Sequence, residues 1–122
     1  MKNLQYTLIH KNNDSEFCIR VSEPGSTESL GEIWVCSVKM NFFGVRVALW
    51  ETHSSVITSL RNKGVGVTLY DKAIAYCLSK GYRIGSATNT SPMAQRVWLS
   101  KRLNTKYRIF KVSKRYYVFG KK

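Results

Sequence analysis

The stretch that decides the fold is Leu60-Arg61-Asn62-Lys63-Gly64-Val65-Gly66-Val67. It lies between a segment rich in β-forming residues and a segment with helical periodicity. Two glycines separated by one residue, just before a helix, form a loop whose backbone N–H groups can face an anion. Arg61 and Lys63 add positive charge at the same place. This is the chemistry of a pyrophosphate clamp, so the stretch predicts a bound phosphorylated cofactor.

The chain before this loop reads as an antiparallel meander of strands. Four segments are rich in aromatic and β-branched residues and are separated by polar turns. They are Leu4–Ile9, Phe17–Val21, Glu32–Val38 and a long segment from Val45 toward Ile57. The length of the last segment leaves room for a bulge.

The chain after the loop changes to helical spacing. From Val65 to Lys80 apolar residues recur every three or four positions, which predicts a helix, and Gly81 is suited to end it. A short strand, Tyr82–Gly85, follows. Because a strand, a helix and a strand succeed one another here, we expect a right-handed crossover between two parallel strands.

A second helix and two closing strands complete the predicted elements. Ser91 suits the N-cap and Pro92 the first position of a helix that ends near Leu103-Asn104. The strands Tyr107–Val112 and Arg115–Phe119 then flank a tight turn. Together the elements predict a mixed α+β fold: a twisted, mostly antiparallel sheet of six to seven strands with two main helices.

The composition is that of a folded, strongly basic chain. Its 122 residues are 43% hydrophobic and 22% charged, which predicts one domain over residues 1–122. The net charge of +13 is uneven, because residues 1–32 hold three basic and five acidic side chains, whereas residues 33–122 hold seventeen basic and two acidic ones. Residues 101–122 hold nine basic side chains and no acid. Such a field attracts a nucleic acid, another acidic macromolecule or an anionic cofactor, unless it is only a solvated face.

The cysteines and the hydropathy pattern exclude several classes of protein. Cys18, Cys36 and Cys77 are widely spaced, and neither His10 nor His53 completes a zinc pattern with them. We therefore expect buried thiols in a reducing cytosol and no metal site. No apolar run approaches the roughly 20 residues that span a bilayer, and no signal-peptide pattern opens the chain. The sequence thus predicts a cytoplasmic protein.

The segment Arg61-Asn62-Lys63-Gly64-Val65-Gly66 matches the signature Arg/Gln-x-x-Gly-x-Gly/Ala. With the surrounding order of long strand, loop, helix, strand, helix and two closing strands, it resembles the GNAT superfamily of acyl-CoA-dependent N-acetyltransferases over residues 32–119. A Walker A loop would need a Gly-Lys-Ser/Thr ending, and a dinucleotide-binding loop would need glycine where Leu69 stands. A purely structural glycine-rich turn is the remaining alternative.

The resemblance implies acetyl-CoA as the cofactor and a set of residues that bind it. In the family, loop amides hold the coenzyme A pyrophosphate at the helix N-terminus, and the preceding strand bonds the pantetheine arm. The implied clamp is Arg61, Asn62, Lys63, Gly64, Val65, Gly66 and Val67, and the implied pantetheine strand is Val56, Ile57 and Thr58. A backbone N–H near Val56 would stabilise the oxyanion. Ser91, which stands where the family often has Asn, completes the cofactor-binding set.

The second helix departs from the family where a general acid is usual. Ala94 fits the family pattern, but Trp98 stands where a Tyr protonates the leaving thiolate. An indole N–H is a poor proton donor, and Trp98 alone reads as a core residue. Either Tyr107 or a water then serves as the acid, or catalysis is weak or absent.

Two residues of the long strand are candidates for the general base. Family members that use a Glu often carry it about ten residues before the loop, and Glu51 lies ten residues before Arg61. His53, two residues on, shares its face if the strand is regular. Either residue is otherwise a solvated side chain at a bend in the strand.

The first part of the chain also departs from the family, which usually places two helices after its first strand. Residues 10–31 are too short and too rich in turn residues for both, so we expect an unusually open acceptor site with a basic rim. The small size and high charge resemble compact acetyltransferase-like proteins of phages and mobile elements, which would act in the bacterial host cytoplasm.

Two functions follow from these features. One is an N-acetyltransferase, a monomer or homodimer, whose acceptor amine is nucleic-acid-associated or otherwise anionic. The other is a catalytically degenerate protein of this fold that binds DNA or RNA. Its support is the aromatic residues that interleave with basic side chains in the last segment, namely Tyr107, Phe110, Tyr116, Tyr117 and Phe119. Those aromatics are alternatively the inward faces of two closing strands.

Overall fold

The structure, a computed structural model, describes residues 4–11, 15–42, 44–56 and 64–122. Four strands form the antiparallel meander that the sequence predicts. They are β1 (Gln5–Lys11), β2 (Glu16–Ser22), β3 (Gly31–Phe42) and β4 (Val45–Val56). The ladder between β3 and β4 keeps one register along both strands, so the bulge that their length allowed does not occur in it.

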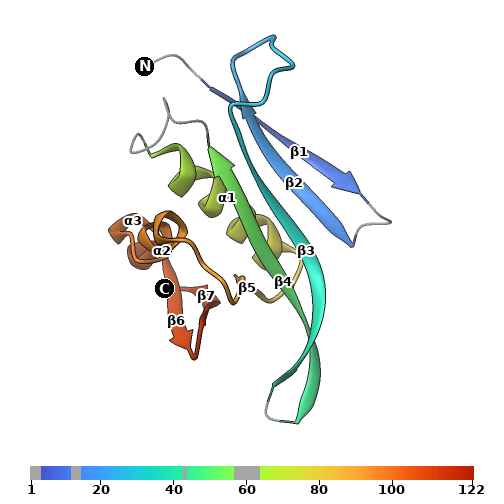
Figure 1. Cartoon of the computed structure of the whole chain (residues 1–122), viewed down its shortest axis with the longest axis vertical. Coiled ribbons are helices and arrows are strands. Elements are labelled where there is room, and N and C mark those ends of the chain that lie inside the picture. The colour runs from blue at the N-terminus through green and yellow to red at the C-terminus, as the bar shows by residue number, and fades with distance from the viewer. Residues whose placement is uncertain (1–3, 12–14, 43, 57–63) are drawn as a thin grey trace.

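Helix α1 (Val65–Ser79) packs its apolar stripe against the sheet (Figure 1). The stripe is the one predicted from spacing, with Leu69, Ala73, Ile74 and Cys77 fully buried. The helix ends as predicted, because Gly81 adopts a φ of 74° and the chain turns back so that the Tyr82 N–H donates to the Cys77 carbonyl.

The remaining strands extend the same sheet. Strand β5 (Ile84–Ser86) lies parallel to β4, which makes β4, α1 and β5 the expected crossover unit. The last two strands, β6 (Tyr107–Val112) and β7 (Arg115–Lys121), form a hairpin, and the strand order is β1-β2-β3-β4-β5-β7-β6. The fold is therefore the mixed α+β arrangement with a mostly antiparallel sheet that the sequence predicts.

The predicted second helix is divided into α2 (Pro92–Trp98) and α3 (Lys101–Lys106). Ser100 opens α3 as its N-cap, and its hydroxyl accepts a hydrogen bond from the Leu103 N–H. Asn104 locks the bend, because its side-chain amide donates to the carbonyls of Trp98 and Ser100. The prediction of one continuous helix was wrong because these capping bonds replace helical ones.

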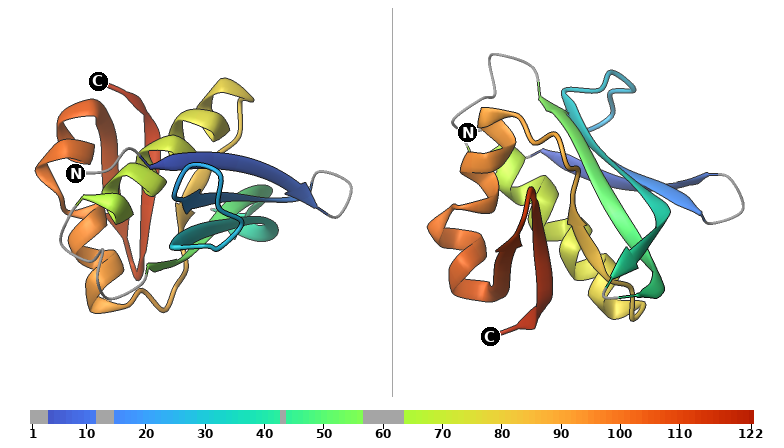
Figure 2. Two further views of the ribbon diagram at one scale, coloured as in Figure 1. Left: turned by 90° about the horizontal axis from the view of Figure 1, so that it is seen from above. Right: turned by 60° about the horizontal axis from the view of Figure 1, so that its bottom comes forward.

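The helices lie on one face of the sheet. Phe17 and Trp50 of that face pack in the core with α1, and the Trp98 ring of α2 stacks on Tyr116 of β7. Figure 2 shows α2 and α3 beside the first half of α1 and next to the hairpin. In Figure 1, β4 passes in front of α1, and no helix of the described residues lies in front of β3 or β4. Strands β3 and β4 therefore leave one face of the sheet without helical cover.

Candidate active site

Strands β4 and β5 diverge at their carboxyl ends. They pair only from Trp50 to Thr52 on β4, opposite Ile84 to Ser86 on β5. Beyond Thr52, β4 continues to Val56 with β3 as its sole strand partner among the described residues, while the chain after Ser86 turns away into α2. The divergence opens a wedge between two strands and leaves backbone groups of β4 facing it.

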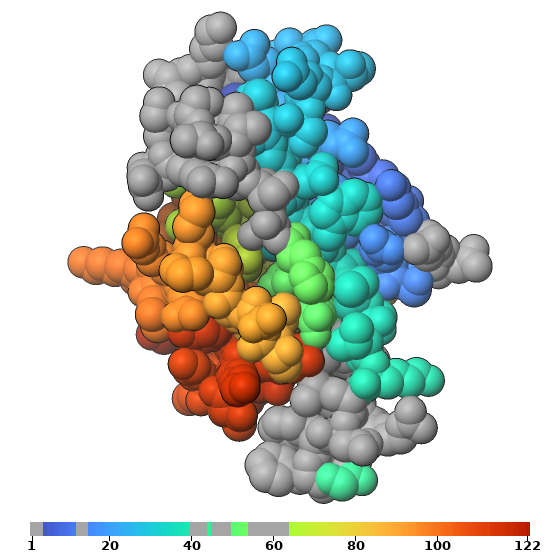
Figure 3. All heavy atoms as spheres, in the orientation of Figure 1, coloured from blue at the N-terminus to red at the C-terminus, as the bar shows by residue number. Residues whose placement is uncertain are grey.

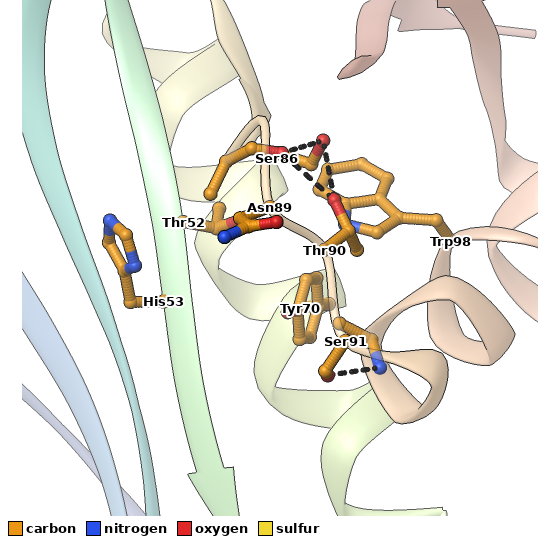
Figure 4. Close-up of a pocket in the computed structure, with 10 residues that line it drawn as sticks. Thr52, His53, Tyr70, Ser86, Asn89, Thr90, Ser91 and Trp98 are labelled. Atoms are coloured by element: carbon orange, nitrogen blue, oxygen red, sulfur yellow. Dashed lines mark hydrogen bonds between the residues drawn. The ribbon is translucent and has the colours of Figure 1, made fainter. Parts of the chain in front are cut away.

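A cavity of about 190 Å³ lies in this wedge. Its lining comes from β4 through Thr52 and His53, from α1 through Tyr70, and from the segment between Ser86 and Trp98 (Figure 4). Ser91 lines it as predicted, although its hydroxyl also accepts the Ala94 N–H as the N-cap of α2. The cavity therefore joins the open edge of β4 to the start of α2.

Hydroxyl groups hold the cavity wall in place. The Ser86 hydroxyl accepts the Tyr116 N–H at 2.9 Å, and the Thr90 hydroxyl donates to the Ala87 carbonyl at 2.8 Å. The Thr52 hydroxyl donates to the Gly85 carbonyl at 3.3 Å, which ties the last paired residues of β4 and β5 together. These bonds fix the segment that leads from β5 into α2.

The Trp98 indole is the polar group of the cavity wall that the fold leaves unsatisfied. Its side chain is fully buried, edge-on to Tyr70 and stacked on Tyr116, and Nε1 has no hydrogen-bond partner among the described residues. An unsatisfied buried donor costs about 1–3 kcal/mol. An acceptor atom of a ligand would remove this cost by reaching Nε1, which requires the cavity wall to shift because Nε1 is buried in this structure.

The other end of the site is the N-terminus of α1. Gly64 caps the helix with a φ of 80°, a conformation that favours glycine, and its carbonyl accepts hydrogen bonds from both the N–H and the hydroxyl of Thr68. Arg102 of α3 donates to that hydroxyl at 2.9 Å, and the first turn holds no acidic residue. A helix N-terminus with an adjacent guanidinium attracts anions.

Gly66 has no packing reason to be glycine. A methyl group at this position would lie 3.7 Å from the Val97 side chain, an ordinary contact, yet glycine in a helix costs up to about 1 kcal/mol relative to alanine. A small residue at this position leaves the first-turn backbone of α1 open to a ligand. Together with the Trp98 donor, this fits a phosphorylated ligand that extends from α1 into the cavity.

Part of the predicted cofactor site cannot be compared with the structure. Five of its residues lie outside the described ones, namely Ile57, Thr58, Arg61, Asn62 and Lys63. Apart from Ser91, the others fall at the two ends of that gap: Val56 is the last residue of β4, and Gly64 precedes Val65, Gly66 and Val67 of the first turn of α1.

The two candidate bases, Glu51 and His53, are in contact. Their side chains lie on the same side of β4, with His53 Nε2 3.2 Å from Glu51 Oε1. The other carboxylate oxygen accepts a 2.5 Å hydrogen bond from Arg115 Nη1, which also donates to the Ser86 carbonyl at 2.9 Å. Because an ionised carboxylate only accepts, Nε2 of His53 is the donor in this contact, and in the neutral imidazole this leaves Nδ1 as the acceptor. Figure 4 shows the imidazole across the β4 ribbon from Thr52.

Tyr107, the predicted acid, lies elsewhere. It is fully buried, it does not line the cavity, and its hydroxyl donates to Asp71 Oδ1 at 2.6 Å. Burial raises the pKa of Tyr107, and the hydrogen bond to Asp71 raises it further. A hydroxyl so placed is suited to hold Asp71, and its catalytic role stays a prediction.

Sequence reasoning missed Arg115, and it read Trp98 only as core. Arg115 is 64 residues from Glu51 in the chain, and only the β5-β7 pairing brings them together. A lone arginine at the start of a closing strand carries no signal of this contact. For Trp98 the signal was present, because an indole nitrogen in a core position needs a partner.

The sheet, the diverging β4 and β5, and α1 beginning at the wedge define an acetyltransferase fold of the GNAT type, as the sequence predicts. The structure is similar to a Pyrococcus furiosus protein assigned as an acetyl transferase, with a TM-score of 0.54 and 20% sequence identity over 80% of this chain and 63% of that one. It is also similar to an aminoglycoside acetyltransferase from an uncultured soil metagenomic sample, with a TM-score of 0.53 and 16% identity over 81% of this chain and 64% of that one.

The chain thus spans less than two thirds of the length of these two acetyltransferases. No family model and no curated protein matches it. The described residues include no helix long and apolar enough to cross a membrane. They also bring together no group of three His, Cys, Asp or Glu side chains that could hold a metal ion.

Proposed function

We propose that this chain is an acyl-CoA-dependent N-acyltransferase that uses acetyl-CoA and acts on an amine carried by an anionic acceptor. The observation that supports it most is the wedge between β4 and β5, which joins the N-terminus of α1 to a cavity with an unsatisfied indole donor. When bound, acetyl-CoA supplies an acyl group activated as a thioester. The charge of the chain favours an anionic acceptor, since residues 33–122 hold seventeen basic side chains and two acidic ones.

Residues at both ends of the wedge would hold the cofactor. The first-turn N–H groups of α1, together with Arg102 beside Thr68, would bind phosphate oxygens. The backbone of β4 beyond Thr52 offers an unpaired edge to amide groups of the pantetheine arm, and the Trp98 N–H offers one further hydrogen bond. The role of Val56 as the oxyanion donor and those of residues 57–63 remain predictions.

His53 would take the proton from the attacking amine. Its Nδ1 is the nitrogen that Glu51 leaves as an acceptor, and its ring is half exposed on the helix-free face, where a large acceptor can reach it. Glu51 orients the imidazole, and Arg115 holds Glu51 through the opposite oxygen. This assigns the two candidate residues to one unit, with His53 as the base and Glu51 as its support.

A second candidate function is nucleic-acid binding without acyl transfer. Trp98 favours it, because the indole can donate a hydrogen bond but does not release its proton at neutral pH. A change at the N-terminus of α1 distinguishes the two functions. An acyltransferase should lose affinity for its cofactor, whereas a nucleic-acid-binding protein should keep its affinity for nucleic acid.

Replacing Gly66 with alanine and, separately, with leucine tests the proposed function. We expect Gly66→Ala to raise the free energy of unfolding by about 0.5–1 kcal/mol, since alanine favours the helix and fits beside Val97. Alanine also satisfies the Gly/Ala position of the signature, so Gly66→Ala should keep its affinity for acetyl-CoA, whereas the bulky side chain of Gly66→Leu should weaken binding at least tenfold by filling the space beside the first turn of α1. Isothermal titration calorimetry in low salt measures the affinity, and urea unfolding measures the stability.

Gly66→Ala is the matched control, and the stability measurement shows whether Gly66→Leu keeps its fold, so that loss of the ligand is separated from misfolding. Failure of the wild-type chain to bind acetyl-CoA at several hundred micromolar would overturn the acyltransferase proposal. Unchanged binding by Gly66→Leu at retained stability would instead move the cofactor away from α1.

A further inference from the structure

The hairpin of β6 and β7 exposes a pair of aromatic rings. Phe110 and Phe119 stack on each other with centroids 5.0 Å apart, and they are 49% and 61% exposed. Val112, 42% exposed, follows Phe110 by two positions on the same face of the strand. The other aromatics of this segment, Tyr107, Tyr116 and Tyr117, are buried. The structure thus separates two solvent-facing rings from those that only fill the core; we call Phe110, Val112 and Phe119 the aromatic platform.

The aromatic platform lies on the face of the sheet that carries His53. Val112 pairs directly with Arg115, so their side chains share a face, and the Arg115 guanidinium on that face reaches Glu51, the partner of His53. Figure 3 looks onto the helix-free side of β3 and β4, with the atoms of the hairpin (red) below those of the segment after β5. A polymer seated on the platform can therefore extend toward His53 without crossing a helix.

The charge around the platform is positive and is not offset. Residues 101–122 hold nine basic side chains and no acid. The two acids of residues 33–122 are both engaged within the molecule, Glu51 with Arg115 and Asp71 with Lys106. Exposed cations on the hairpin therefore face solvent near the aromatic rings; they include Arg108, Lys114 and Lys121.

Exposed stacked rings flanked by cations match one class of partner better than others. Single-stranded nucleic acid supplies both phosphates for the cations and unpaired base faces for the rings. A duplex hides its base faces. A second copy of this chain would bring a net charge of +13 against +13, so repulsion opposes that use of the surface.

We propose that the aromatic platform and its flanking cations dock single-stranded nucleic acid. The docking itself is independent of acyl transfer; the claim that such a strand carries the acceptor amine toward His53 rests on the proposed function. Bases stack on Phe110 and Phe119, while the hairpin cations contact the phosphates.

Fluorescence anisotropy with labelled U20 RNA and dT20 DNA tests the proposal at 50 and 200 mM salt. We expect Phe110→Ala/Phe119→Ala to weaken binding of both strands at least tenfold with an unchanged salt slope. The matched control is Leu99→Ala, which removes an equally exposed apolar side chain from the end of α2 and should bind as the wild type does. Phe110→Tyr/Phe119→Tyr keeps the rings and should restore affinity, which separates stacking from a folding defect.

Charge variants test the other half of the surface. We expect Arg108→Gln/Lys114→Gln to lower the salt slope of log K by about 1 to 1.5, since each lost phosphate contact removes about 0.7 for a single strand. Lys72→Gln/Lys80→Gln, which removes two exposed cations, one in α1 and one at its C-cap, should leave the slope unchanged.

Three results would overturn the proposal. The first is no binding of either strand at 50 mM salt. The second is an equal loss of affinity for the strands in the phenylalanine and Leu99 variants. The third is that the phenylalanine substitutions abolish only a homodimer, measured by light scattering, and leave strand binding unchanged. Acetyl-CoA titration of the same variants keeps the two proposals apart. A chain that binds U20 but not acetyl-CoA retains the docking surface and loses the acyltransferase function.

Discussion

At the scale of single residues, Asp71 organises the contacts between α1 and α3. It is buried in α1, where Oδ1 accepts hydrogen bonds from the Tyr107 hydroxyl at 2.6 Å and from Lys106 Nζ at 2.9 Å. Arg102 Nη2 lies 3.6 Å from Oδ2. Burial alone would raise the pKa of Asp71, but the hydrogen bonds from Tyr107 and Lys106 outweigh it, so the pKa lies below its usual value.

This lowered pKa makes the stability depend on acid pH. Because the folded-state pKa of Asp71 is below the unfolded one, its contribution is complete above the ordinary pKa of about 3.9 and is lost as pH falls through the folded value. We expect Asp71→Asn to lower the free energy of unfolding by about 1–3 kcal/mol at pH 7 and to flatten its decline below pH 4. Urea unfolding from pH 7 to pH 3 measures both effects.

The control for this prediction is Glu28→Gln, which removes an exposed carboxylate and should leave the stability at pH 7 unchanged. Tyr107→Phe should reproduce part of the loss, because Asp71 then keeps only its contacts with Lys106 and Arg102. If Tyr107→Phe instead abolishes acyl transfer at full stability, the hydroxyl is the acid that the sequence predicted.

At the scale of elements, the bend between α2 and α3 determines where Trp98 and Arg102 point. Sequence periodicity treated residues 92–104 as one helix, because neither proline nor glycine interrupts it. The bend arises from the Ser100 cap and from Asn104, whose two hydrogen bonds are formed only once the chain has turned. Such capping is weakly encoded, since Ser and Asn also occur within helices.

Asn104 is therefore the residue whose loss should loosen this bend. We expect Asn104→Ala to lower the free energy of unfolding by about 1–3 kcal/mol, since two hydrogen bonds to backbone carbonyls are lost. Thr105→Ala, at an exposed position of the same helix, should change it by less than about 0.5 kcal/mol. Denaturant titration compares the two, and equal stabilities would mean that the bend is held by burial of Leu103 alone.

At the scale of the whole molecule, the unbalanced charge opposes folding. A net charge of +13 on 122 residues produces self-repulsion in the compact state, and both acids of residues 33–122 already have internal partners. We expect the unfolding temperature to rise by about 4 °C or more between 20 and 300 mM sodium chloride, which corresponds to relief of about 1 kcal/mol. Differential scanning fluorimetry measures this temperature. An unfolding temperature that falls as salt is added would show that attractive surface ion pairs outweigh the self-repulsion.

The fold and the site were predictable to different degrees. The meander, α1 with its Gly81 end and the crossover to β5 follow from local patterns, and each is present. The candidate bases were correctly placed on one face of β4 by its period of two. Arg115 was not recognised, because a contact between β7 and β4 depends on strand order rather than on spacing. The Trp98 donor was missed although the sequence carried its signal, a polar nitrogen at a core position.

By itself, the sequence determined the local elements, the glycine cap before α1 and the basic charge of residues 33–122, because each depends on residue type and on neighbours a few positions away. Only the tertiary structure decided which aromatic rings face solvent, that Glu51 is held between His53 and Arg115, and that Tyr107 bonds to Asp71. These contacts join residues 36 and 64 positions apart, and strand order and helix packing select them, which no local pattern encodes.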